Sequence, residues 1–198
     1  MTARTSQIAL IFSAFLTGLV IFSGVFLYAT GNFGGGGPAA SAIGGPFKLV
    51  DQNGDPITDA DLKGKPHLVF FGYTHCPDIC PTTLFDVSEV LRALGKDADG
   101  TGALFITVDP ERDTPAVMKD YLSSFNPHLR GATGDRAAID AAEKSYRVYA
   151  KKVPTQSGDY SMDHTALVYL MDKQGRFVAP FSLKRKPEEA AADLRRYM

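Results

Sequence analysis

The sequence has 198 residues, 44% of them hydrophobic and 22% charged, and its formal net charge is -1. This composition is typical of a globular protein that is long enough to bury a core of its own. A charge so close to zero argues against the broad basic face with which proteins hold nucleic-acid phosphates. The basic clusters Lys151-Lys152 and Lys184-Arg185-Lys186 are short and typical of solvated surface. We therefore expect no nucleic-acid partner.

The first element along the chain is an uncharged apolar segment, residues 8–28. Its length matches the roughly 20 residues that a helix needs to cross a bilayer core. Arg4 precedes the segment and no acidic residue does, so the positive-inside rule predicts residues 1–7 in the cytoplasm. A cleaved signal peptide is the alternative, because Ala40-Ser41-Ala42 has the form of a cleavage site. This cleavage site lies far beyond the end of the apolar segment, and the segment itself is longer than the apolar region of a typical signal peptide. We therefore expect an uncleaved transmembrane anchor.

A linker and a single domain follow the anchor. Residues 29–45 are rich in Gly, Ala and Pro and predict a flexible linker. Residues 46–198 form one domain without an internal repeat. Anchor and signal peptide would both export this domain, which in a bacterium places it in the periplasm, where thiols are normally oxidised. We expect a single-pass protein of the bacterial inner membrane.

Strand and helix patterns alternate through the domain, which predicts an α/β fold around a mixed sheet. Continuous apolar runs indicate buried strands, and apolar residues at helical spacing indicate helices. Thr114 and Asp135 stand where helix N-caps are expected, with Pro115 at a first helical position. In chain order, the patterns predict a hairpin over 47–58 that turns at Asn53-Gly54, strands over 66–73 and 103–108, helices over 81–94, 113–125 and 135–149, a second hairpin of strands 164–172 and 176–181, and a helix over 186–197.

The two cysteines, Cys76 and Cys80, stand where a buried strand ends and a helix begins. We expect Pro81 in the first turn of that helix and both sulfurs near its free N–H groups, where the helix dipole lowers the pKa of a thiol. A disulfide between them would close so short a loop that it would stabilise the fold little. The pair is therefore predicted to act as a redox dithiol or as part of a site for a soft metal. The usual redox motif has one residue fewer between its cysteines.

A metal site needs a further ligand, and the chain offers four histidines. His67 and His128 are typical of structural or exposed positions. His75 adjoins the first cysteine, but neighbouring side chains often diverge. His164 opens the expected strand 164–172, from which it could reach a site at the end of a parallel neighbour. Spacing alone leaves a ligand role and a structural role for His164 equally open.

Three segments together closely resemble the signatures of the Sco/SenC family: GYTHCPDICPTTL (72–84), TVDPERDTP (107–115) and DHTALVYLMD (163–172). The resemblance covers about residues 45–198, with the segments in the family's order and spacing. It implies a membrane-anchored, copper-binding protein that helps to assemble cytochrome c oxidase. The fold it implies is a thioredoxin-like mixed sheet with flanking helices and an N-terminal β-hairpin extension, preceded by the transmembrane helix.

The family's copper ligands fall on Cys76, Cys80 and His164. Two thiolates and one imidazole form a three-coordinate site that suits Cu(I), whereas a structural zinc site would want a fourth protein ligand. Asp78 or Asp163 could supply that ligand, so the sequence leaves zinc open. Three acidic residues are expected to shape the site or to meet a partner: Asp78, Asp109 and Asp163.

The resemblance implies a copper chaperone, and not an enzyme, that binds one Cu(I) or Cu(II) ion and aids maturation of the dinuclear copper centre of the oxidase. Its expected partners are the copper-bearing oxidase subunit and other periplasmic copper carriers or thiol reductants. The alternative is a thiol–disulfide reductase, in which Cys76 and Cys80 form a redox-active disulfide while keeping the subunit's cysteines reduced. His164 separates the two functions, since simple disulfide exchange does not need it. A thiol peroxidase is disfavoured because Thr74 lies too close to Cys76, and a copper or redox sensor stays open.

Overall fold

The computed structural model describes the following parts of the chain: residues 13–26, 28, 43–156 and 158–198. The chain divides into two compact units, residues 1–40 and residues 41–198.

In the first unit, residues 13–26 are helical. Among the described residues, no helix is both long enough and apolar enough to cross a membrane. Part of the expected anchor over 8–28 and most of the expected linker over 29–45 lie outside the described residues. The anchor and the linker therefore stay predictions.

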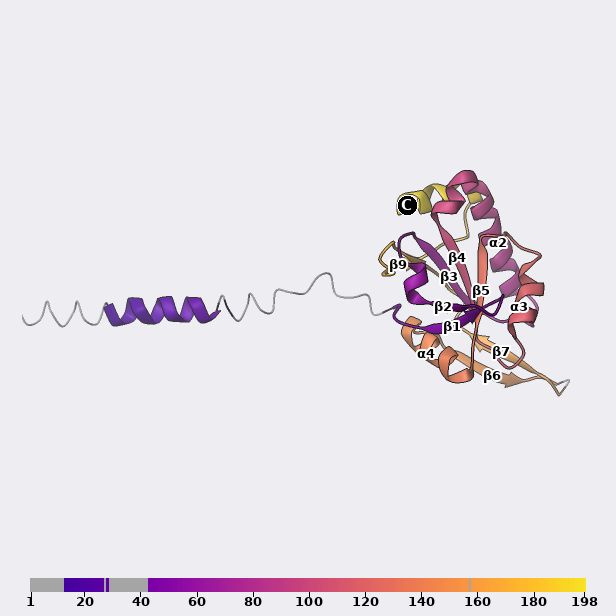
Figure 1. The fold of residues 1–198 in the computed structure, drawn as a ribbon, viewed down its shortest axis with the longest axis horizontal. Coiled ribbons are helices and arrows are strands. Elements are labelled where there is room, and N and C mark those ends of the chain that lie inside the picture. The colour runs from indigo at the N-terminus through magenta and orange to yellow at the C-terminus, as the bar shows by residue number, and fades with distance from the viewer. Residues whose placement is uncertain (1–12, 27, 29–42, 157) are drawn as a thin grey trace, which may run out of the picture. The chain divides into compact units, whose positions relative to one another are not determined.

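The second unit is an α/β fold (Figure 1). Its elements follow in chain order: β1 (Lys48–Asp51), β2 (Pro56–Thr58), η1 (Asp59–Leu62), β3 (His67–Gly72), α2 (Ile79–Leu94), η2 (Gly95–Gly100), β4 (Gly102–Thr107), α3 (Pro115–Leu122), β5 (Leu129–Thr133), α4 (Arg136–Tyr146), β6 (Ala150–Pro154), β7 (Tyr160–His164), β8 (Val168–Met171), β9 (Phe177–Pro180) and α5 (Pro187–Arg195).

Seven of these strands form one sheet in the order β2-β1-β5-β4-β3-β8-β9. β3, β4 and β5 run parallel to one another, and the other pairings in this sheet are antiparallel. The predicted mixed sheet and its N-terminal hairpin are confirmed. Gly54 lies in the hairpin turn at φ +88, a conformation that glycine adopts without the usual steric penalty.

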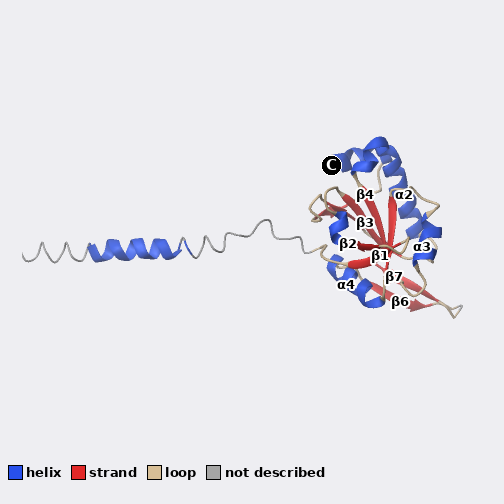
Figure 2. Cartoon of the chain, viewed as in Figure 1, coloured by secondary structure: helices blue, strands red, loops and turns tan. Residues whose placement is uncertain are grey.

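Helices cover both faces of the sheet, and Figure 2 shows the strands gathered between them. Tyr121 of α3 contacts Phe105 of β4, whereas Tyr146 of α4 contacts Phe71 of β3. All six residues of β3 are buried, as expected for a strand covered on both sides.

The helix starts follow the predicted capping residues. The side chain of Thr114 accepts a hydrogen bond from the backbone N–H of Val117, with Pro115 in the first turn of α3. The side chain of Asp135 accepts one from the N–H of Ala138. Both N-caps are confirmed, because a side-chain oxygen satisfies an N–H group that has no partner within the helix.

The expected strand over 164–172 is wrong at its start. β8 begins only at Val168, and it runs antiparallel to β3, not parallel. His164 instead ends β7, which pairs with β6 in a separate two-stranded sheet that we did not predict. Most side chains of these two strands are exposed or half-buried, so the sequence carries no apolar alternation that would reveal them.

Candidate metal centre

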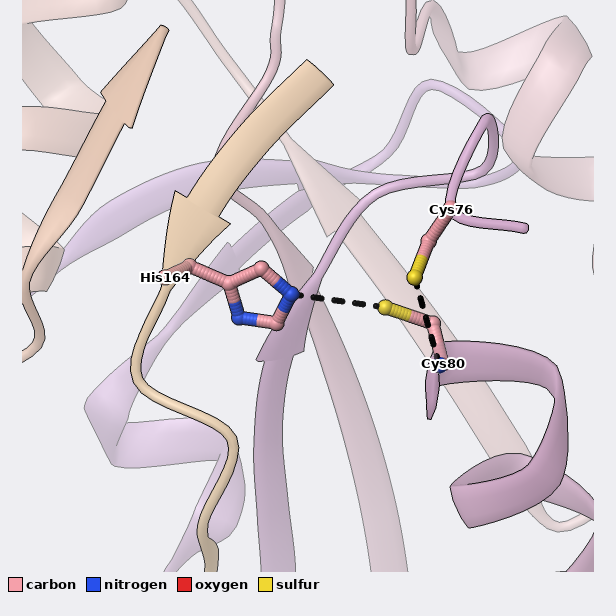
Figure 3. Close-up of side chains that lie close together, drawn as sticks. All are labelled: Cys76, Cys80 and His164. Carbon is pink, nitrogen blue, oxygen red and sulfur yellow. Dashed lines mark hydrogen bonds between the residues drawn. The ribbon is translucent and has the colours of Figure 1, made fainter. Parts of the chain in front are cut away.

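Two neighbouring cysteines and a histidine from a distant part of the chain meet at the end of β3: Cys76, Cys80 and His164. Their sulfur and nitrogen ligand atoms all lie within 4.8 Å of one another. In Figure 3 the imidazole points at the sulfur of Cys80, and the sulfur of Cys76 lies beside it. The distance from His164 Nε2 to Cys80 Sγ is 3.6 Å. The structure thus brings together the three residues on which the copper ligands of the resembled family fall.

The cysteines come from the β3–α2 connection and from the start of α2. Cys80 is in the first turn of the helix, and its backbone N–H donates to Cys76 Sγ over 3.4 Å. Gly72 ends β3 close to the Cys80 sulfur, since a Cβ added there would lie 2.7 Å from Cys80 Sγ. A glycine at this position leaves the space that the Cys80 sulfur fills.

A buried carboxylate holds the connection between β3 and the cysteines. Asp113 accepts hydrogen bonds from the N–H of Thr74 at 3.0 Å and from its hydroxyl at 2.6 Å. The hydroxyl of Thr107 donates to the same carboxylate at 2.6 Å. Thr74 lies shortly before Cys76, so these bonds fix the path of the chain into the site.

The histidine comes from the end of β7. Its Nδ1 lies 3.1 Å from the carbonyl oxygen of Thr165. A carbonyl can only accept, so the bond requires the proton on Nδ1 and leaves the lone pair of Nε2 directed at the sulfurs. The ring packs edge-on against Tyr73, with ring centroids 5.8 Å apart. This is the orientation that a metal-binding imidazole needs.

The protonation states differ from those expected from the helix dipole. Burial raises the pKa of the Cys80 thiol, so the expectation of a lowered pKa is wrong for this residue. The sulfur has no exposure to water, and the cost of burying a thiolate exceeds the stabilisation from the helix terminus. Burial also lowers the pKa of His164, which keeps its imidazole neutral and able to bind a metal. A metal ion that binds Cys80 must displace its proton, which couples binding to proton release.

A surface pocket of about 570 Å³ opens onto the site. Cys76 and His164 line this pocket, whereas Cys80 lies behind them. Asp78 and Asp163 also line it, but among the described residues neither belongs to the ligand cluster. The cluster thus offers three protein ligands, two of which face this pocket.

The remaining acid, Asp109, is fully buried. It accepts hydrogen bonds from Arg112 Nε at 2.5 Å and from the Tyr160 hydroxyl at 2.9 Å. We expected Asp109 either to shape the site or to meet a partner, and its buried position fits the first of these roles. Arg112, Asp113 and Tyr160 had not been singled out, although the first two stand in the quoted segment 107–115.

The other histidines lie outside the cluster. His75 is half-exposed, and its Nδ1 lies 3.1 Å from the hydroxyl of Thr74. His67 and His128 line a different pocket, together with residues from the start of β4. His67 is buried, with Nδ1 3.0 Å from the carbonyl of Lys65, which is the structural position expected for it.

Comparisons with known proteins agree with the resemblance found in the sequence. The family model SCO1/SenC matches residues 36–198. A SCO2-like protein of Rickettsia felis is 40% identical over 149 residues, which are 74% of this chain and 73% of that protein.

Solved structures share the fold. Bradyrhizobium japonicum ScoI with copper bound is 72% identical with a TM-score of 0.77, over 79% of this chain and 99% of that one. Yeast Sco1 with copper bound is 38% identical with a TM-score of 0.71, over 78% of this chain and 87% of that one. The predicted thioredoxin-like fold is thereby confirmed for the second unit. The chain belongs to the SCO1/SenC family.

Proposed function

We propose that this chain binds one copper ion through Cys76 Sγ, Cys80 Sγ and His164 Nε2 and passes it to the dinuclear copper centre of cytochrome c oxidase. The observation that carries the proposal is the convergence of these three atoms within 4.8 Å. Soft thiolates select Cu(I), and an imidazole suits either oxidation state of copper. In the described residues no carboxylate joins the cluster, which disfavours a four-ligand structural zinc site.

The geometry also suits a site that must give up its ion. Cys76 and His164 line the open pocket, so an acceptor's ligands can approach the ion from that side. Ligands can then exchange one at a time, and the copper is never released as a free ion. The buried Cys80 would be the last of the three ligands to release the copper ion.

Relatives support copper as the cargo and an oxidase as the destination. The Bradyrhizobium and yeast structures hold copper. A more distant protein with the same fold, BsSco, is described as a member of the Sco family of cytochrome c oxidase assembly proteins. The proposed acceptor is the copper-bearing oxidase subunit, with periplasmic copper carriers and thiol reductants as further partners.

The proposed layout gives the site access to a membrane-bound acceptor. Residues 1–7 lie in the cytoplasm, residues 8–28 cross the inner membrane, and residues 29–45 link the anchor to a periplasmic domain over 46–198. A tether of this kind raises the effective concentration of the domain near the acceptor.

A second function uses the same cysteines as a thiol–disulfide reductase. Both are free thiols on a thioredoxin-like fold, and Cys76 is the more exposed of the two. The Cys76 thiolate would attack an acceptor disulfide and form a mixed disulfide as one acceptor thiolate leaves. Cys80, once deprotonated, would then attack Cys76 Sγ and release the second acceptor thiolate. The acceptor gains two electrons, and the chain ends with a Cys76–Cys80 disulfide.

Copper stoichiometry and the electronic spectrum of the reduced full-length chain test the primary proposal. One copper per chain is expected, with an intense thiolate-to-Cu(II) charge-transfer band that His164→Ala removes or strongly shifts. His75→Ala is the matched control, because it removes a nearby histidine outside the cluster. A wild-type chain that binds no copper tightly, yet still reduces disulfides, would favour the reductase instead.

A further inference from the structure

The three proposed ligands sit on two parts of the domain that no strand pairing joins within the described residues. Cys76 and Cys80 follow β3 of the seven-stranded sheet, whereas His164 ends the separate β6–β7 hairpin. The distance from imidazole to sulfurs therefore depends on the contacts that hold the hairpin against the rest of the domain. One short turn, residues 109–113, contacts both parts.

On the cysteine side the contact is Asp113. This carboxylate is fully buried and accepts both the N–H and the hydroxyl of Thr74. The turn is therefore fixed to the chain segment that leads into Cys76.

On the histidine side the contact is the neighbouring residue, Arg112. Its Nη1 donates to the carbonyl of Tyr160 at 3.0 Å, and its guanidinium lies 3.8 Å from the centre of the Tyr160 ring. Asp109 completes the arrangement, since it accepts from Arg112 Nε and from the Tyr160 hydroxyl. Tyr160 begins the strand that His164 ends. The turn thus holds the short strand that carries the histidine.

Arg112 also lies near the ring that packs against His164. The centre of the Tyr73 ring is 5.8 Å from the Arg112 guanidinium and 5.8 Å from the centre of the His164 ring. Arg112 Nη2 is buried and has no hydrogen-bond partner in the part of the chain that the structure describes.

We propose that Arg112, oriented by Asp109, is a positioning residue that sets the copper affinity by holding His164 at its distance from the two sulfurs. The inference rests on the proposed copper site and adds a determinant of its strength. Without the guanidinium, the cysteines keep their place through Asp113, while the hairpin loses the hydrogen bond and the ring contact that Arg112 makes with Tyr160. Such a variant retains binding through the two sulfurs and loses the contribution of the imidazole.

The test is a double-mutant comparison in the full-length chain, with Cu(I) affinity measured by competition against a chromogenic chelator. Arg112→Met is expected to weaken affinity by about 10- to 100-fold, as for other residues that orient a metal ligand. In a His164→Ala background the same change is expected to cause no further loss. Glu111→Gln is the matched control: it removes the exposed ion pair from this turn to Lys152 of the hairpin, and such pairs contribute little.

A second readout needs no metal. Amide hydrogen exchange at Tyr160–His164 in the copper-free chain is expected to accelerate in Arg112→Met and not in Glu111→Gln. Should Arg112→Met fail to fold, Tyr160→Phe keeps the ring and removes only the hydroxyl bond to Asp109, with a smaller loss of affinity in the same direction.

The outcomes separate this inference from the proposed function. A wild-type chain that does not bind Cu(I) overturns the proposed function. Wild-type binding with unchanged affinity in Arg112→Met overturns only the positioning role. An equal loss with and without His164 also overturns it, because Arg112 would then act on the cysteines or on folding.

Discussion

The sulfur of Cys80 lies against the α-carbon of Gly72, and a Cβ at position 72 would stand only 2.7 Å from it. The same Cβ would lie 2.7 Å from a ring carbon of Phe105. The end of β3 is therefore closely packed beneath the proposed copper site. This close packing contributes to the complete burial of Cys80, and that burial raises the pKa of its thiol.

Gly72→Ala is expected to damage stability and metal binding together. Overpacking of a core typically costs about 1–3 kcal/mol of unfolding free energy, and here the side chain that must move is a proposed ligand. Urea unfolding and Cu(I) competition measure the two effects. Gly100→Ala is the control, because a Cβ there meets no atom within 4 Å. Unchanged copper affinity in Gly72→Ala would show that the position of this sulfur is not critical.

Asp113→Asn is expected to lower the unfolding free energy by about 1–3 kcal/mol. The carboxylate accepts three hydrogen bonds on its two oxygens, and a neutral amide would remove the charge that strengthens them and force the Thr74 hydroxyl to accept instead of donating. Urea unfolding gives the change in free energy, and Asp120→Asn, an exposed acid of α3, is the control. Equal stability of Asp113→Asn and wild type would contradict the role given to this carboxylate.

Copper affinity is expected to fall at acid pH in two separable parts. Thiol protonation weakens binding in every variant, whereas imidazole protonation matters only when His164 is present. Because burial lowers the pKa of His164 from 6.5, the imidazole part of the loss lies below pH 6.5. Affinities of wild type and His164→Ala at pH 7.5, 6.5 and 5 isolate this part. Parallel pH profiles would count against the imidazole as a ligand.

His67 is expected to make folding stability depend on pH away from the copper site. Burial lowers the pKa of His67 from 6.5 to about 4. As pH falls from 6.5 to about 4, the unfolded chain binds a proton before the folded chain does, so stability decreases with falling pH. The loss is on the order of 3 kcal/mol and is complete below about pH 4.

The measurement is urea unfolding of wild type and His67→Gln between pH 7 and 4, since the variant lacks the titrating group. A smaller pH dependence in the variant is expected. Identical pH dependence in the two chains would mean that His67 is accessible to protons in the folded state.

The sequence predicted those parts of the fold that leave a local pattern. Continuous apolar runs revealed β3 and β4, and the capping residues Thr114 and Asp135 revealed the starts of α3 and α4. β5 was missed because it contains Gly131, which is needed where Leu122 of α3 packs closely against the strand. A tertiary contact of this kind has no signal in the segment itself.

The site, too, was predicted only where its residues leave a local pattern in the sequence. The cysteine pair could be placed because the sequence predicted the strand before it and the helix after it. His164 became a ligand candidate by resemblance to a family. Its strand, β7, could not be predicted because polar, largely exposed residues form it. The pKa of Cys80 was misjudged because the helix dipole is a local property, whereas the burial that outweighs it comes from residues distant in the sequence. The Arg112–Tyr160 contact is likewise visible only in three dimensions.

The most direct test of the proposed copper site is X-ray absorption spectroscopy at the copper edge of the Cu(I)-loaded full-length chain, with His164→Ala beside it. We expect two sulfur atoms and one nitrogen atom bound to copper in the wild type, and loss of that nitrogen in the variant. A sulfur-only shell, or a nitrogen contribution that persists unchanged in His164→Ala, would contradict the proposed site.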